Sequence, residues 1–152
     1  MKDLFAEYLA RHSKEETCVA LVCASYKTVY QRKHRHPLID DRVNTELATY
    51  GDALLRFTLT ALFLDRVERL SEYIKPFLTD EFLIEHVAKH YGLLDHMLFD
   101  RTNPQIKQQY VHYDNDATKY IATTVEAVLG DIYRETHSMP AIRRIVERWT
   151  HL

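Results

Sequence analysis

Two acidic residues stand out because each lies in an otherwise apolar stretch with a glycine close by. Asp52 directly follows Gly51, and Glu126 precedes Gly130 by four residues. Both stretches have helical patterning, and a glycine inside a helix costs about 1 kcal/mol relative to alanine. Close packing of one helix on another accounts for such glycines, because they have no Cβ to hold the backbones apart. We therefore expect Asp52 and Glu126 to face one another across two packed helices.

Two carboxylates that converge in an apolar setting repel one another unless a cation or a proton lies between them. A hard divalent ion such as Mg²⁺ meets this need, since it takes oxygen ligands and keeps several waters. The alternative is that each acid pairs with a nearby arginine or caps a neighbouring helix. Spacing alone leaves both interpretations open.

The elements that position these acids are predicted to be helices. The chain has three glycines and four prolines in 152 residues, fewer turn residues than an all-β chain of this length needs. Alternating strand patterns are not found. We predict a single all-α domain with polar loops over 31–37 and 100–114. Helices are expected over 2–11, 13–30, 41–70, 79–92, 114 or 116 to 135, and 139–149.

Local signals support several of these boundaries. Ser13 and Glu16 have the spacing of a capping box at a helix start, and Gly92 suits a helix end. Ser138 with Pro140 marks the start of the last helix. The middle of the long helix, residues 52–65, is apolar nearly all round. Such a segment is buried within the domain or at a subunit interface.

Composition excludes some classes of protein. No apolar run approaches the roughly 20 residues of a membrane span, and the first residues lack the pattern of a signal peptide. Cys18 and Cys23 are expected to be buried free thiols, which suits a reducing cytoplasm. The formal net charge of −2 points to no general affinity for nucleic acid.

A dense basic run offers a local exception. Arg32, Lys33 and Arg35 alternate with histidines over residues 32–36. They could grip RNA phosphates in a salt-sensitive way. A solvated basic loop explains the run equally well.

Four segments resemble the catalytic domain of ribonuclease III. Residues 44–55, N-T-E-L-A-T-Y-G-D-A-L-L, are similar to that family's signature N-E-R-L-E-F-L-G-D-A-V-L. Residues 123–130, T-T-V-E-A-V-L-G, resemble its second acidic helix, D-x-V-E-A-L-I-G. Residues 20–26 and 86–94 resemble its A-L-T-H-R-S-Y and L-A-x-x-A-x-x-x-G-L segments. The order is the family's own, over about 110 residues.

The resemblance implies a helical homodimer that cuts double-stranded RNA with Mg²⁺ (or Mn²⁺). Four carboxylates hold the metals in that family, and Asp52 and Glu126 match two of them. Ala48 stands where a glutamate is expected and Thr123 where an aspartate is expected. Thr45 replaces a further glutamate. Two carboxylates per subunit could still hold one Mg²⁺, with weaker or more restricted activity.

The two acidic helices are closest to those of Mini-ribonuclease III, short bacterial relatives with L-A-x-x-G-D-A and T-x-x-E-A-L-L-G. Like them, this chain is expected to lack a double-stranded-RNA-binding domain. The longer N-terminal region is nearer to the full enzyme, so the sequence resembles a divergent member.

From this we expect a cytoplasmic, dimeric endoribonuclease that acts on structured or double-stranded RNA. Asp52 and Glu126 would be the catalytic, metal-binding acids. Substrate contacts are assigned to Arg32, Lys33, Arg35 and Asn44. The alternative is an inactive ribonuclease III-like scaffold that dimerises or binds RNA or a ribonucleoprotein. A Mg²⁺-dependent helical hydrolase of another substrate class is a third hypothesis.

Overall fold

The computed structural model describes residues 2–39, 42–102 and 115–152. Helices dominate these residues and none of them forms a β-strand, which confirms the predicted all-α fold. The longer helices are α1 (Leu4–His12), α2 (Tyr26–His34), α3 (Thr45–Phe63), α8 (Asn115–Thr136) and α9 (Met139–Trp149). Shorter segments are η1 (Val19–Leu21), α4 (Leu70–Ile74), η3 (Lys75–Leu78), α5 (Asp80–Phe82), the π-helical η4 (Leu83–Ala88), α6 (Lys89–Tyr91) and η5 (Leu93–Asp95).

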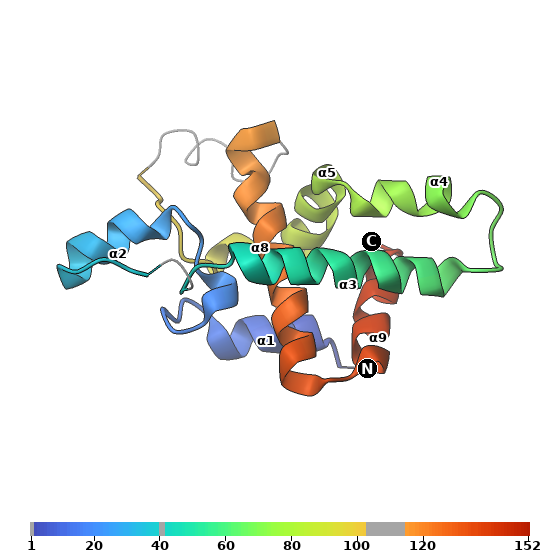
Figure 1. Cartoon of the computed structure of the whole chain (residues 1–152), viewed down its shortest axis with the longest axis horizontal. Coiled ribbons are helices and arrows are strands. Elements are labelled where there is room, and N and C mark those ends of the chain that lie inside the picture. Colours follow the sequence, from blue (N-terminus) through green and yellow to red (C-terminus); the bar gives the residue numbers. More distant parts are fainter. Residues whose placement is uncertain (1, 40–41, 103–114) are drawn as a thin grey trace.

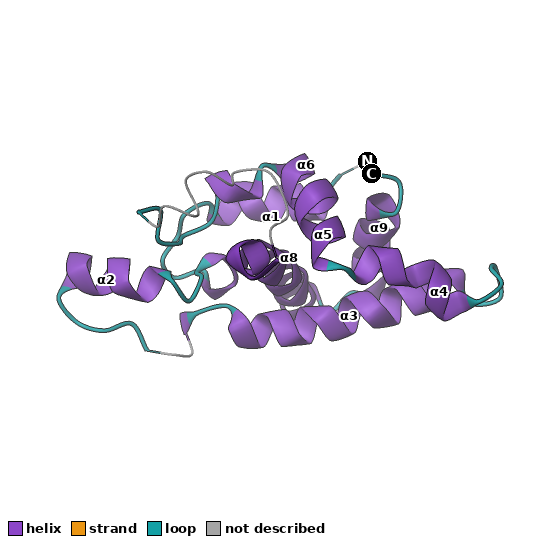
Figure 2. Cartoon of the chain, turned by 90° about the horizontal axis from the view of Figure 1, so that it is seen from above, coloured by secondary structure: helices purple, strands orange, loops and turns teal. Residues whose placement is uncertain are grey.

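Helix α3 runs along the long axis of the molecule, and α8 crosses it (Figure 1). This crossing is the most extensive contact between two elements of the described structure. Figure 2 shows α8 nearly end-on, with α3 along one edge and most other helices to one side of it. One face of α3 therefore packs into the domain while the opposite face is left uncovered.

Two glycines allow α3 and α8 to touch backbone to backbone. A Cβ on Gly51 would lie 1.7 Å from the carbonyl oxygen of Glu126, and one on Gly130 would lie 2.8 Å from the carbonyl oxygen of Leu47. Neither position has room for a side chain, because the atoms in the way belong to the backbone of the other helix and cannot move aside as a flexible side chain could. The prediction that these mid-helix glycines serve close packing is confirmed.

Capping residues set several helix boundaries. Asp3 accepts hydrogen bonds from the backbone N–H groups of the first turn of α1, and Thr79 accepts one from Phe82 N at 3.1 Å. Ser138 accepts one from Ala141 N at 3.2 Å at the start of α9. Gly92 ends α6 with a φ of 60°. The predicted end at Gly92 and the predicted helix 139–149 are confirmed.

The predicted helix over 13–30 is wrong. Ser13 ends α1, and Lys14 takes a left-handed φ of 57° and donates its N–H to the carbonyl of His96 at 2.9 Å. Cys23 N–H likewise donates to the carbonyl of Leu98 at 2.9 Å. These long-range hydrogen bonds compete with a continuous helix, so only η1 and α2 are helical. Cys18 and Cys23 are buried free thiols, as expected.

Two other predicted segments differ from the structure, and one lies outside the described residues. Helix α3 covers 45–63 rather than 41–70, because the chain turns at Leu64 and Asp65 has a φ of 64°. The predicted loop 31–37 is partly helical, since α2 continues to His34. Residues 103–114 of the predicted polar loop, and the proposed helix start at Asp114, lie outside the described residues.

Hydrophobic side chains of α1, α3, η4, α8 and α9 form one main core. None of the helices described is both long and apolar enough to cross a membrane. By contrast, an apolar stripe on the uncovered face of α3 is solvent-exposed. We call it the outer stripe; it consists of Tyr50, Ala53, Phe57, Ala61 and Leu64.

Candidate functional site

The two acids meet at an open cleft of about 380 Å³ between α3, α5 and the first half of α8. Asp52 approaches from α3 and Glu126 from α8, and their side chains are hydrogen-bonded. The predicted facing arrangement is thus present in the structure. The cleft is lined by Thr45, Ala48, Thr49, Asp52, Leu78, Asp80, Lys119, Thr123 and Glu126.

The backbone contact between the helices brings the acids together. Gly51 lies against the carbonyl of Glu126, so the neighbouring residue, Asp52, emerges from α3 beside the Glu126 side chain. Leu55 and Val125 are buried in the adjoining core and hold the two helices in this register. The separation of the acids is therefore set by packing of the main chain rather than by flexible side chains.

Electrostatics at the cleft favour a bound positive charge. Burial raises the pKa of Glu126 to about 9, helped by the hydrogen bond to Asp52 and by the charges of Asp52 and Asp80. Lys119 acts in the opposite direction and lowers it. At neutral pH Glu126 therefore keeps its proton unless a cation takes that place.

The ligands on offer suit a hard cation, but there are few of them. The cleft presents carboxylate and threonine oxygens and no sulfur or imidazole. Within the described residues no group of three or more His, Cys, Asp or Glu side chains is compact enough to enclose a metal. Asp52 and Glu126 thus offer the oxygen ligands that hard cations take, but only two carboxylates.

The three positions at which the resemblance implies acids line this cleft. Thr45 lies on the α3 wall two turns before Asp52, and Ala48 lies one turn before it; Thr123 lies one turn before Glu126 on α8. The sequence pattern therefore identified the correct helix faces. These three residues therefore share the cleft with Asp52 and Glu126.

The assignment of Asn44 to substrate binding is wrong. Its side chain is 1% exposed and donates hydrogen bonds to the carbonyl of Ala20 and to Thr124 Oγ1, both at 3.0 Å. It joins the start of α3 to η1 and α8. Asn44 therefore has a structural role that motif position alone did not reveal.

Two charged residues of the cleft were missed by the sequence analysis. Asp80 was treated only as part of a helix start, and Lys119 was not considered. Lys119 could have been found, because residues 119, 123 and 126 share a helix face at spacings of four and three. No comparable signal exists for Asp80, which reaches the cleft from α5 through the tertiary fold.

The basic residues lie on a different part of the surface. Arg32 and Arg35 border an open hollow of about 470 Å³ beside α2, which shares no residue with the acid cleft. Lys33 pairs with Glu16 at 3.4 Å, and His34 contacts the same carboxylate at 2.9 Å. Part of the basic run is therefore neutralised within the fold, while Arg32 and Arg35 line the open hollow.

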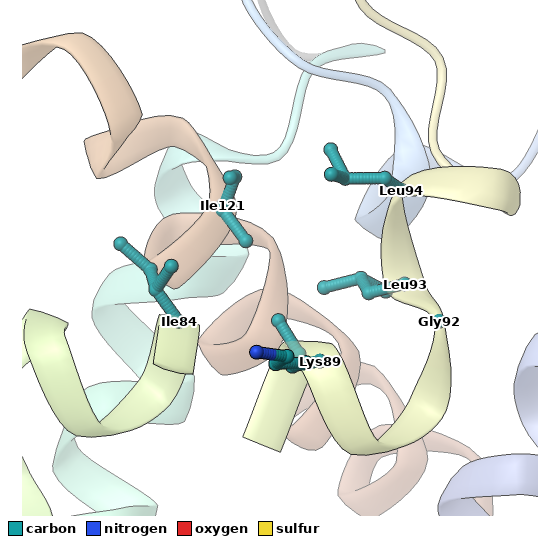
Figure 3. A pocket seen from close by; sticks show the side chains of 7 residues that line it. Ile84, Lys89, Gly92, Leu93, Leu94 and Ile121 are labelled. Carbon is teal, nitrogen blue, oxygen red and sulfur yellow. The ribbon is translucent and has the colours of Figure 1, made fainter. Parts of the chain in front are cut away.

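A third hollow has a different chemical character. It has a volume of about 80 Å³, and apolar side chains of η4, η5 and α8 point into it, with Lys89 at one side (Figure 3). It offers no carboxylate, thiol or imidazole for catalysis. This apolar pocket therefore does not compete with the acid cleft as a reactive site.

The fold matches that of the nuclease domain of ribonuclease III from Campylobacter jejuni. The two structures align with a TM-score of 0.67 at 16% sequence identity, over 95% of this chain and 92% of that one. Comparison of the sequence with family models and with curated proteins finds no match. A structural match at so low a sequence identity supports a shared fold and does not establish a shared activity. This chain has the helical architecture of a ribonuclease III nuclease domain.

Proposed function

We propose that this protein is a Mg²⁺-dependent endoribonuclease that cleaves structured or double-stranded RNA. The observation that carries the proposal is the pairing of Asp52 with Glu126 in an open cleft on this particular fold. A paired, partly buried acid with a raised pKa is a common mark of a functional site. The RNA substrate is inferred from the fold likeness together with the motif resemblance.

Asp52 and Glu126 would hold the ion, with Mn²⁺ as a substitute for Mg²⁺. Bound metal would supply positive charge beside a phosphate and lower the pKa of a coordinated water. Glu126 would release its proton on binding metal, because a cation replaces the proton between the two carboxylates. With Ala48 and Thr123 in place of acids, we expect slower or more selective cleavage than a four-acid site would give.

Substrate would be held in part by α2. Arg32 and Arg35 face an open hollow and are exposed, as phosphate-binding side chains must be. Lys33 is assigned to the same surface, although its present partner is Glu16. Contacts of this kind weaken steeply with salt, so RNA binding should do so as well.

The active form would be a homodimer that buries the outer stripe of α3. Phe57 and Leu64 are 62% and 57% exposed, which is unusual for large apolar side chains that share one helix face. The Campylobacter structure concerns flexibility in a region involved in dimer formation. A second copy of this chain is the occupant that this fold likeness favours.

Cleavage of duplex RNA tests the proposal. Purified wild type is incubated with long duplex RNA and Mg²⁺ beside Asp52→Asn, Glu126→Gln and the surface control Glu147→Gln. Wild type and the control should cut, and both cleft variants should lose about 100-fold or more in rate. If wild type and cleft variants leave the RNA equally intact, the nuclease proposal fails for duplex RNA.

A second candidate is an inactive scaffold of the same fold. The loss of acids at Ala48 and Thr123 favours it, since the metal site is then reduced to two carboxylates. The scaffold should dimerise, or bind RNA, without Mg²⁺-dependent cleavage. Calorimetry separates the nuclease from the scaffold. The nuclease should bind Mg²⁺ at millimolar concentration, whereas the scaffold should show no heat of Mg²⁺ binding.

A further inference from the structure

We propose that Lys119 is the phosphate-binding cation of the acid cleft. The inference rests on the proposed nuclease function and adds to it a residue that neither the sequence motifs nor the fold likeness assigns. Lys119 lies in the first half of α8 on the face that carries Thr123 and Glu126. Its side chain thus borders the same cleft as Asp52.

The lysine is placed to receive an anion. It is exposed, and its ammonium has no ion-pair partner among the described side chains. A long side chain that is charged yet unpaired at a cleft wall can turn towards a ligand at little cost. Its charge already acts on Glu126, whose pKa it lowers.

Lys119 offsets negative charge that would otherwise repel an RNA phosphate from the cleft. The carboxylates of Asp52 and Asp80 repel a phosphate diester, and a site with only two metal-binding acids can hold little metal charge to offset this repulsion. Lys119 is one turn from Thr123, on the side where the expected aspartate is missing. A fixed ammonium there adds positive charge without needing a carboxylate to hold it.

This arrangement assigns the charged groups different roles. Asp52 and Glu126 would serve the metal, while Lys119 would contact a non-bridging phosphate oxygen and hold the RNA strand over them. Charge that develops on the phosphate oxygens during displacement is stabilised by a positioned cation. Lys119 should therefore contribute to turnover as well as to binding.

The test compares Lys119→Gln and Lys119→Arg with wild type, and uses Lys89→Gln as the matched control. Lys89 is an exposed lysine on another helix, beside the apolar pocket. Binding of a short RNA duplex is measured by fluorescence anisotropy in Ca²⁺ over a range of salt concentrations. Lys119→Gln should bind about tenfold more weakly, and the slope of log K against log salt should fall by about one. Lys119→Arg should retain most of the affinity.

A measurement of Mg²⁺ binding guards against a purely structural effect. By calorimetry, Lys119→Gln should bind Mg²⁺ at least as tightly as wild type, because a repelling charge has been removed. Loss of Mg²⁺ binding together with RNA binding would mean that the cleft is disturbed, and would overturn the assignment. Wild-type affinity and salt slope in Lys119→Gln would overturn it as well.

The outcomes separate this inference from the nuclease proposal. If wild type binds RNA through Lys119 but leaves it uncut, the phosphate contact stands and the nuclease proposal fails. If wild type cuts RNA and Lys119→Gln binds and cuts equally well, only the lysine assignment fails. If wild type does not bind duplex RNA, both fail.

Discussion

The two faces of α3 are apolar for different reasons. On the inner face, Gly51 lets the backbone of α3 rest on the carbonyl of Glu126. On the outer face, Phe57 and Leu64 extend from the domain into solvent. The sequence shows only a helix that is apolar nearly all round. The structure separates the apolar residues that fix the fold from those that lie exposed to solvent.

The difference between the two faces of α3 also explains the position of Asp52. Asp52 lies at the edge of the inner face, so it reaches an open cleft while its neighbour Gly51 is enclosed. The outer stripe carries no charged residue of its own. If this division is right, changes to the inner face should affect folding, changes to the outer stripe should affect association, and changes at the cleft should affect ion binding.

Gly51→Ala should have the largest effect. The added Cβ would stand 1.7 Å from the carbonyl oxygen of Glu126, and only separation of α3 and α8 can relieve this overlap. We expect a loss of about 4 kcal/mol or more in the free energy of unfolding, measured by urea denaturation. Ala53→Ser on the outer stripe should cost about 0.5 kcal/mol. Equal stability of the two variants would contradict the close crossing.

Phe57→Glu should weaken dimerisation while leaving the fold of each subunit intact. A charge in the middle of the outer stripe should weaken dimerisation about 100-fold or more, measured by light scattering over a concentration series. The thermal midpoint of a monomer should hardly change, because the site is 62% exposed. Leu152→Glu is the control, an exposed apolar residue outside α3. A wild-type protein that stays monomeric at high concentration would refute the proposed dimer.

Restoring the expected acids should strengthen ion binding. The double variant Ala48→Glu with Thr123→Asp adds two carboxylates to a cleft that already holds Asp52 and Glu126. We expect Mg²⁺ affinity to rise about tenfold or more, measured by calorimetry. Acids added at Thr49, also on the cleft wall but not a motif position, should help less. An unchanged affinity would show that the cleft is not a metal site of this type.

The smallest of these expected effects is the change in thermal stability caused by Glu126→Gln, and it depends on pH. The folded protein holds a proton on Glu126 up to a pKa of about 9, whereas the unfolded chain releases it near 4.5. Stability that depends on this proton is complete below about pH 4.5 and is lost as the pH rises towards 9. Without metal, the variant should therefore gain about 2 °C or more in Tm at pH 8 and little at pH 4. The same gain at both values would contradict a raised pKa.

Sequence reasoning succeeded where the signal depends only on residues close by in the same helix. Gly51 and Gly130 indicated close packing, and Ser138 with Pro140 marked a helix start, because each signal is local or concerns one helix face. These predictions needed no knowledge of the rest of the chain. The motif resemblance singled out Thr45, Ala48 and Thr123, and helical spacing places them on the same faces as Asp52 and Glu126.

Sequence reasoning failed where residues far apart in the chain compete for the same hydrogen-bonding side chain. Ser13 and Glu16 have capping-box spacing, but Glu16 accepts from Tyr26 at 2.7 Å and binds Lys33 and His34 instead. Such partners, ten to eighteen residues away, cannot be read from a four-residue pattern. Asp80 reaches the cleft for the same reason. The likeness of the acidic helices to Mini-ribonuclease III stays a prediction.

The cleft at the α3–α8 crossing has a consequence for how such a protein can evolve. Its wall consists mostly of side chains that are only partly buried, whereas the contact that fixes its shape is made by backbone and glycine. Residues at the wall can thus be exchanged by drift without much penalty to folding. The chemistry of the site can be lost, narrowed or regained within a few substitutions, while the architecture persists at 16% identity to its structural neighbour.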